Sequence, residues 1–239
     1  MTKRIHLISC PRNLSTALMY SFAQREDTSV VDEPMYANYL SRTGIEHPGR
    51  QEIIDSMPAD LERVKSESIF NHCDTPLYFI KNMSQHFYDI DESFILDLEN
   101  VIYIRNPQQI IASFAKVIEH PNGRDVGIQK QHDLYHYLIK AKREPIVLDS
   151  GELLSNPQKV LNTLCDRLGI SFSNKMLSWK PGPRKEDGVW AKYWYGNVHK
   201  STGFAPQKTS NQPLPEELMP LYEETIGYYT ELYNLAIKA

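Results

Sequence analysis

A short loop near the start of the chain most constrains what it can fold into. An apolar run at residues 5–8 is followed by Cys10-Pro11-Arg12-Asn13-Leu14-Ser15-Thr16, and a helical pattern begins at Ser15. A helix that starts just beyond a strand directs free backbone N–H groups, and the positive end of its dipole, at one point. An arginine and two hydroxyls lie at that point. The segment therefore predicts a site for a phosphate or sulfate group.

Composition limits the other possibilities. The chain has 239 residues and no Gly/Ser-rich linker, so we expect one domain over residues 1–239. A net charge of −4 argues against a nucleic-acid partner, so an anion site needs locally placed Arg and Lys. Three scattered cysteines favour a reducing, cytoplasmic setting over a disulfide framework or a Cys-based zinc site. We expect neither a signal sequence nor a membrane partner, because the apolar runs are short.

Apolar runs alternate with helical patterns along the chain. The expected strands cover residues 5–9, 29–32, 77–80, 101–104 and 145–148. The expected helices cover residues 15–25, 58–72, 107–119, 126–143, 157–168 and 216–238. This alternation predicts an α/β fold with a mostly parallel sheet flanked by helices, and ligands bound beyond the carboxyl ends of the strands. Residues 178–214 form an aromatic and proline-rich segment, interpreted as a long ordered loop, and residues 215–239 the C-terminal helix.

A second strand–arginine–helix unit follows in the middle of the chain. The run Val101-Ile102-Tyr103-Ile104 leads into Arg105-Asn106-Pro107, with Asn106 and Pro107 as a helix start and Ser113 further along that helix. Arg105 would lie at the same sheet edge as Arg12 and could bind a second phosphate with two hydrogen bonds. The alternative is an arginine paired with a carboxylate and a serine that faces solvent. Two such units favour a ligand with two separated anionic groups.

Two further charged residues follow strands. Glu33 lies in Asp32-Glu33-Pro34, and because proline restricts the preceding residue to extended geometry, we expect Glu33 to project from the strand end. There it is a candidate general base; the alternative is a surface turn or an ion pair with Arg12. Lys81 lies where another strand ends and can neutralise charge on a leaving group; the alternative is a solvated lysine.

Together these motifs resemble the sulfotransferases that use 3′-phosphoadenosine 5′-phosphosulfate. Residues 11–16 resemble that family's 5′-phosphosulfate loop, and residues 101–107 with Ser113 resemble its 3′-phosphate motif. Glu33-Pro34 resembles the Glu-Pro of the bacterial branch, and the similarity extends over about residues 3–172. Residues 187–204 resemble a narrower sulfotransferase-like subgroup, whose relatives are often labelled as similar to branched-chain aminotransferases. Nothing in the sequence suggests a pyridoxal enzyme.

The resemblance implies a phosphate-loop-like topology and a set of roles. Sulfuryl transfer to a small hydroxyl or amine acceptor would use Glu33 as base, with Lys81 and Arg12 stabilising charge and no metal. The implied nucleotide-binding residues are Arg12, Asn13, Leu14, Ser15 and Thr16 for the 5′-phosphosulfate, and Arg105 and Ser113 for the 3′-phosphate. We expect the acceptor pocket at Tyr36, Tyr39, the His72 region and the aromatic loop. The sequence does not specify the acceptor or the oligomeric state.

One residue departs from the family pattern and keeps two alternatives open. The family's loop glycine, which permits a positive φ, is Leu14 here. A non-catalytic nucleotide- or anion-binding module of the same fold is therefore the second hypothesis. A different phosphate-loop transferase using ordinary nucleotides is the third, although G-x-x-x-x-G-K-[ST] and an obvious magnesium carboxylate are absent.

His132 and His136 stand four residues apart on one predicted helix, as the histidines of H-E-x-x-H metalloproteases do. The acid between them is Asp133, and no downstream spacing places a third ligand. We therefore interpret them as exposed or core-edge histidines.

Overall fold

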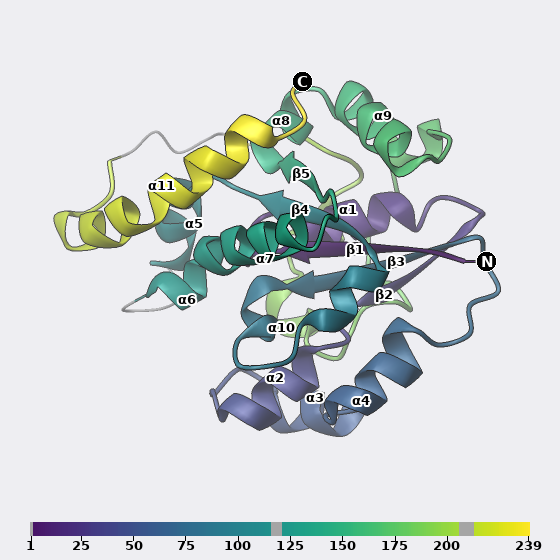
Figure 1. Cartoon of the computed structure of the whole chain (residues 1–239), viewed down its shortest axis with the longest axis horizontal. Coiled ribbons are helices and arrows are strands. Elements are labelled where there is room, and N and C mark those ends of the chain that lie inside the picture. Colours follow the sequence, from purple (N-terminus) through teal and green to yellow (C-terminus); the bar gives the residue numbers. More distant parts are fainter. Residues whose placement is uncertain (1, 116–120, 206–212) are drawn as a thin grey trace.

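The computed structural model describes residues 2–115, 121–205 and 213–239, and within them a parallel sheet runs through the centre of the molecule (Figure 1). Its strand order is β2-β3-β1-β4-β5. The strands are β1 (Lys3–Ser9), β2 (Thr28–Asp32), β3 (Leu77–Met83), β4 (Glu99–Ile104) and β5 (Ile146–Asp149). All five predicted strands and the predicted parallel sheet are confirmed.

The register of the strands brings their carboxyl ends to one edge. Ser9 of β1 pairs with Met83 of β3 and with Tyr103 of β4. On the outer strands, Asp32 pairs with Lys81 and Ile104 pairs with Asp149. The loops that follow β1, β2, β3 and β4 therefore start side by side, which is where parallel α/β sheets bind ligands.

Helices cover both faces of the sheet, as the continuous apolar strands predict. On one face, α1 (Ser15–Phe22) and α9 (Pro157–Leu168) pack with Leu7, Val101 and Tyr103. On the other face, α5 (Pro107–Phe114), α7 (Ile128–Lys140) and α11 (Met219–Leu235) pack with Ile8 and Ile102. Adjacent strand residues thus point to opposite cores. Figure 1 shows α11 beside α7.

The predicted helices are present with shifted ends. The helix at 157–168 is confirmed as predicted, whereas α1 ends at Phe22. The prediction at 58–72 becomes α4 (Leu61–Val64) and a π-helical stretch (Lys65–Ile69). Gly127, with φ +74°, separates α6 (Gly123–Val126) from α7, so the helix expected from residue 126 starts later. Part of the helix expected at 107–119 lies outside the described residues. A 3₁₀ turn (Glu216–Leu218) precedes α11.

Several short helices were not predicted. They are α2 (Tyr36–Thr43), α3 (Arg50–Ser56) and α8 (Ser150–Ser155), with 3₁₀ turns at Ser84–Phe87, Ser93–Asp97 and Asn174–Leu177. The segment expected to be a long loop holds α10 (Ala191–Trp194), a 3₁₀ turn (Val198–Lys200) and an antiparallel bridge between Ser178 and Gly203. Its residues Trp190 and Tyr195 are buried against α2 and α3. Residues 206–212 of that segment lie outside the described residues.

Two expectations from composition can be checked against the fold. The three cysteines are free thiols, with Cys10 and Cys165 buried. In the described parts of the chain, no helix combines the length and apolar character needed to cross a bilayer.

Candidate functional site

The loop after β1 has an unusual backbone. Arg12 has φ +63° and Leu14 has φ +68°, so both are left-handed. Such a conformation is easy for glycine and costs about 1–3 kcal/mol for other residues. Leu14 therefore adopts the backbone conformation for which a glycine is usually needed, and as the residue directly before α1 its own side chain caps no first-turn N–H group. The loop keeps a glycine-like path despite the leucine.

The Asn13 side chain connects this loop to the sheet through hydrogen bonds. Its Nδ2 donates to the carbonyl of Tyr103 at 2.6 Å, and its Oδ1 accepts from the N–H of Ser15 at 3.1 Å. Gln131 of α7 supports the same place, donating to the carbonyls of Ile8 and Tyr103 at 2.9 and 2.7 Å. The buried Asn13 side chain thus points into the fold and shapes the loop.

The two strand–arginine–helix units meet at the sheet edge. Nε of Arg12 donates to Oγ of Ser113 at 2.9 Å, and Nη1 of Arg105 donates to the backbone carbonyl of Arg12. Nε of Arg105 also donates to Gln109 at 3.0 Å. Burial lowers the pKa of Arg105, and the charge of Arg12 adds to that effect. Each of the two arginines stands shortly before the start of a helix, α1 or α5, and two cations in such positions favour an anion.

Beside these two arginines lies a buried group of charged side chains. Lys81 is fully buried, and its Nζ contacts Asp32 Oδ1 at 2.7 Å and Glu33 Oε1 at 2.6 Å. Because β3 continues to Met83, Lys81 lies within the strand rather than beyond its end, and a solvated lysine is excluded. The pairing of Glu33 with Arg12, weighed from the sequence, is not seen; the partner of Glu33 is Lys81.

Tyr195 covers this ion cluster and completes its hydrogen bonds. Its hydroxyl donates to Asp32 Oδ2 at 2.6 Å and accepts from Lys81 and from the Trp190 indole, each at 3.1 Å. Thr16 of the anion loop is a further hydrogen-bond partner of this hydroxyl. Tyr195 thus joins three parts of the chain that are far apart in sequence: the loop after β1, the end of β2 and the aromatic segment.

The backbone of Glu33 differs from the prediction. The residue has φ +44°, in the left-handed region, and the expectation of an extended residue before Pro34 is wrong. Its N–H donates to the carbonyl of Lys81 at 2.7 Å while its carboxylate meets the Lys81 amine, and these two contacts hold the strained conformation. Burial raises the pKa of Glu33, although Lys81 opposes this. Burial alone lowers the pKa of Lys81, but its two carboxylate partners outweigh burial and raise it.

His86 is a candidate that no sequence signal revealed. It is fully buried, its ring stacks on Tyr36 at 5.2 Å, and its Nε2 lies 3.8 Å from Glu33 Oε2. Neither ring nitrogen has a hydrogen-bond partner among the described residues. Burial lowers the pKa of His86 well below its usual value, so the ring is neutral. A neutral imidazole with unused nitrogens beside a carboxylate is equipped to exchange protons.

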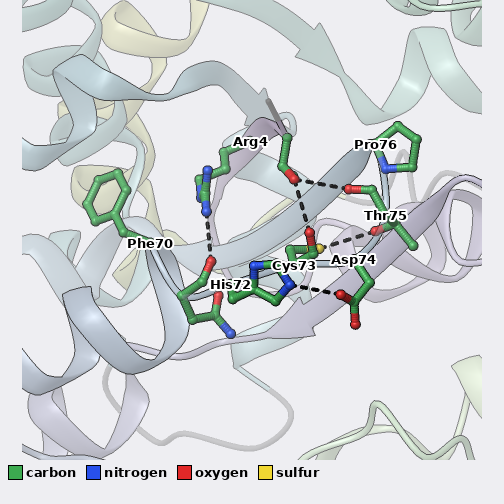
Figure 2. A pocket seen from close by; sticks show the side chains of 9 residues that line it. Arg4, Phe70, His72, Cys73, Asp74, Thr75 and Pro76 are labelled. Carbon is green, nitrogen blue, oxygen red and sulfur yellow. Dashed lines mark hydrogen bonds and ion pairs between the residues drawn. The ribbon is translucent and has the colours of Figure 1, made fainter.

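The expected acceptor pocket is only partly assembled. Tyr36 and Tyr39 lie together around His86, and Trp190 packs against Tyr36 at 5.2 Å. His72 does not belong to this group. It lines an open cavity of about 670 Å³ with Arg4, Cys73 and Thr75, shown in Figure 2, before β3 begins at Leu77. Since this is the amino edge of the sheet, placing the His72 region in the acceptor pocket is wrong.

A second cavity, of about 260 Å³, adjoins Arg105. It is lined by Asn106, Gln109, Asp149 and residues of α8 and α11. Gln109 is the residue that accepts from Arg105, so this cavity opens next to the arginine that follows β4. Its lining includes the carboxylates of Asp149 and Glu152 and, among the described residues, contains no arginine or lysine.

The sequence model of the family described as "Sulfotransferase domain" matches residues 3–234. "Branched-chain-amino-acid aminotransferase-like protein 1" of Arabidopsis thaliana is 40% identical over 229 residues, which make up 95% of this chain and 41% of that protein. The chain thus spans about two fifths of the length of the plant relatives it matches.

Solved structures share the fold. The sulfotransferase domain of the Synechococcus PCC 7002 olefin synthase superposes with a TM-score of 0.58 at 18% identity, covering 93% of this chain and 94% of that domain. Mouse sulfotransferase SULT7A1 complexed with PAP superposes with a TM-score of 0.53 at 10% identity, covering 98% and 88% of the two chains. The predicted phosphate-loop-like topology is confirmed, since these neighbours are sulfotransferases with that fold.

Proposed function

This chain belongs to the sulfotransferase family, and on that premise we propose that it transfers a sulfuryl group from 3′-phosphoadenosine 5′-phosphosulfate to a hydroxyl or amine of a small acceptor. The plant relatives carry an aminotransferase-like name, which describes proteins more than twice as long as this chain. The proposal concerns the sulfotransferase domain of residues 3–234 and not the full-length plant proteins.

The observation that carries the proposal is the contact between the two arginine units. Arg12, Arg105 and Ser113 come from two loops and one helix, yet the Arg12 guanidinium donates to the Ser113 hydroxyl and the Arg105 guanidinium donates to the Arg12 carbonyl. A donor with a 5′-phosphosulfate and a 3′-phosphate carries two anionic groups a short distance apart. In our proposal, the loop of residues 11–16 binds the first group, and Arg105 with Ser113 binds the second.

Sulfuryl transfer then needs a base and charge stabilisation. The acceptor oxygen or nitrogen forms a bond to sulfur as the bond between sulfur and the bridging phosphate oxygen breaks, and 3′-phosphoadenosine 5′-phosphate leaves with the electron pair. Glu33 takes the acceptor proton, helped by its burial-raised pKa. Arg12 and the first-turn N–H groups of α1 stabilise the leaving phosphate. His86, beside Glu33, is placed to pass that proton on.

Lys81 has a more indirect role in this conformation. Its amine is held by Asp32 and Glu33 beneath Tyr195 and Trp190, so it positions the Glu33 carboxylate. Contact of Lys81 or Glu33 with an acceptor requires Tyr195 and Trp190 to move, because both charged side chains are buried. The aromatic segment is therefore part of the proposed acceptor entrance.

The contact between the two arginine units also favours a second candidate, a nucleotide-binding module without turnover. A carboxylate fully paired with a buried lysine also serves as a structural ion pair, and Leu14 replaces the family's loop glycine. This candidate predicts binding of the nucleotide without consumption of the sulfate donor, and binding unaffected by Glu33→Gln.

A transfer assay separates the two candidates. The purified protein is incubated with 3′-phosphoadenosine 5′-phosphosulfate and a panel of small phenols, alcohols and amines, and released 3′-phosphoadenosine 5′-phosphate is measured. Transfer predicts acceptor-dependent release that Glu33→Gln lowers by about 100-fold or more. Tight nucleotide binding without release from any acceptor would replace the enzyme proposal with the binding module.

A further inference from the structure

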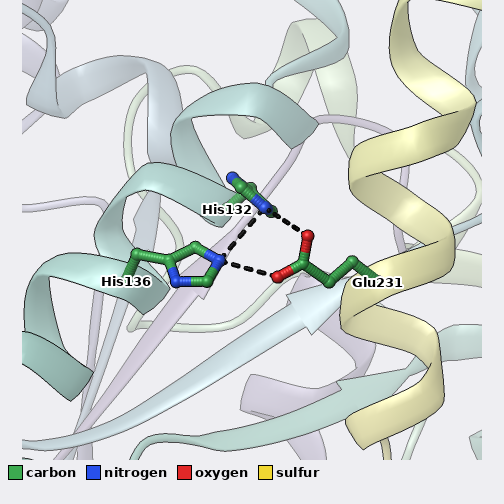
Figure 3. A group of neighbouring side chains, drawn as sticks. All are labelled: His132, His136 and Glu231. Atoms are coloured by element: carbon green, nitrogen blue, oxygen red, sulfur yellow. Dashed lines mark hydrogen bonds and ion pairs between the residues drawn. The ribbon is translucent and has the colours of Figure 1, made fainter.

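The contact between α7 and α11 holds a group of potential metal ligands. His132 and His136 lie four residues apart on one face of α7, and Glu231 reaches them from α11 (Figure 3). The sequence alone supplies no third ligand by spacing, because Glu231 is 95 residues beyond His136. The fold supplies it.

Four polar atoms of these three residues lie close together. Nε2 of His132 lies 2.9 Å from Glu231 Oε2, and Nε2 of His136 lies 2.8 Å from Glu231 Oε1. The two Nε2 atoms are 3.1 Å apart. Ligands of a tetrahedral zinc ion, each about 2.1 Å from the metal, lie about 3.4 Å from one another. The two nitrogens are a few tenths of an ångström closer than this, and each lies near one of the Glu231 oxygens, so small shifts of the side chains would let one such ion contact all three residues.

Each Nε2 has a single in-plane position, which holds either one hydrogen or one lone pair. When both nitrogens carry hydrogen, each ring donates to one oxygen of the Glu231 carboxylate. A divalent cation that displaces these two hydrogens would be bound by all three residues at once.

The surroundings hold the two rings in place. The ring of Tyr228 packs 5.0 Å from that of His132, and Tyr135 packs edge-on against His136 at 5.3 Å. The Asp133 carboxylate lies 3.8 Å from Nδ1 of His132, the ring nitrogen that faces away from Glu231. His136 and Glu231 are half-exposed, so an ion can enter from solvent.

We propose that His132, His136 and Glu231 bind a divalent transition metal, with zinc as the preferred ion and water as the fourth ligand. Two imidazoles and a carboxylate suit zinc better than magnesium or calcium, which prefer oxygen ligands. The ion would fasten α11 to α7, next to Gln131, which anchors the ends of β1 and β4. This site is separate from sulfuryl transfer and does not depend on that proposal.

The test is zinc titration of the purified, metal-free protein by calorimetry, with CoCl₂ as a spectroscopic probe. The wild type should bind one equivalent of zinc and show the visible absorption of tetrahedral cobalt. Zinc at about 100 times its Kd should raise the unfolding midpoint by about 5 °C. His136→Ala and Glu231→Gln, both at half-exposed positions, should each weaken binding by at least about tenfold.

A matched control is His72→Ala, since His72 is an exposed histidine 2.8 Å from the Asp74 carboxylate. It should bind zinc as the wild type does. Absence of zinc binding at about 100 µM metal would overturn the proposal. So would affinity that survives His136→Ala and Glu231→Gln, or that is lost in His72→Ala. Circular dichroism of each variant shows that a loss of binding is not a loss of fold.

Discussion

Nε of Arg12 lies 2.9 Å from Oγ of Ser113, 101 residues further along the chain. This contact joins the loop after β1 to the helix after β4. It places a hydroxyl beside the guanidinium that follows β1, with Arg105 adjacent. The relationship makes the two arginine units one site.

The first prediction concerns that hydroxyl. Ser113→Ala should weaken binding of 3′-phosphoadenosine 5′-phosphate by about tenfold, because it removes a hydrogen bond to a charged group. Calorimetric titration measures it. Ser66→Ala is the matched control, since Ser66 is an exposed helical serine whose hydroxyl contacts only backbone carbonyls. Unchanged affinity in Ser113→Ala would remove Ser113 from the nucleotide site.

Leu14 gives a prediction about the loop. Its left-handed backbone means that Leu14→Gly keeps the loop's path, while release of strain and loss of side-chain packing oppose each other. Stability should change by less than about 1 kcal/mol, and nucleotide affinity should be retained. Leu14→Val, with a β-branched side chain at positive φ, should be less stable than both the wild type and Leu14→Gly. Lost binding in Leu14→Gly alone would show that the leucine side chain contacts the ligand.

A third prediction concerns Tyr195, which packs over the buried side chains of Asp32 and Lys81. Tyr195→Phe removes the donor to Asp32 and the acceptor of the Trp190 indole, and should lower the free energy of unfolding by about 2 kcal/mol. Urea denaturation measures the change. Tyr193→Phe, two residues away on an exposed ring, should change stability by less than about 0.5 kcal/mol. Equal effects of the two variants would contradict the arrangement described for the cluster.

Stability should depend on pH through His6. This buried ring donates from Nδ1 to Asn100 Oδ1 at 2.9 Å, and its Nε2 lies 3.2 Å from the Asn82 amide, so it is held neutral. Burial lowers its pKa from 6.5 to about 4. Between those values the unfolded chain binds a proton that the folded chain does not, so stability falls as pH decreases.

The expected loss is about 1.4 kcal/mol per pH unit, or about 3 kcal/mol by pH 4. His47 and His86, whose pKa values burial also lowers, act in the same direction. Urea unfolding of wild type and His6→Gln from pH 7 to pH 4 measures the slope, which should be shallower in the variant. Identical slopes would show that His6 takes up its proton equally in both states.

Much of the sheet and of the anion loop could be predicted from local sequence. Buried parallel strands are continuous apolar runs, and the helix starts at Ser15 and Asn106-Pro107 carry their own signals. The start of α1 fixes Arg12 at the sheet edge, and the start of α5 does the same for Arg105. Short helices such as α2 and α8, of eight and six residues, were missed because so few residues give only a brief pattern, and helices of this length depend on packing against the rest of the fold.

The buried chemistry could not be predicted, because it depends on contacts between distant residues. Tyr195 reaches Asp32 across 163 positions and Lys81 across 114. The positive φ of Glu33 follows from its two contacts with Lys81 rather than from Pro34. Glu231 joins the two histidines of α7 only because α11 packs there. Spacing in the sequence carries none of this information.

The most direct measurement compares two nucleotides on the wild-type protein by calorimetry: 3′-phosphoadenosine 5′-phosphate and adenosine 5′-monophosphate, which lacks only the 3′-phosphate. If the Arg12 and Arg105 units bind opposite ends of one ligand, the first should bind about 100-fold more tightly, since Arg105 and Ser113 each add a charge-assisted hydrogen bond. Equal affinities, or no binding of 3′-phosphoadenosine 5′-phosphate at millimolar concentration, would contradict that site.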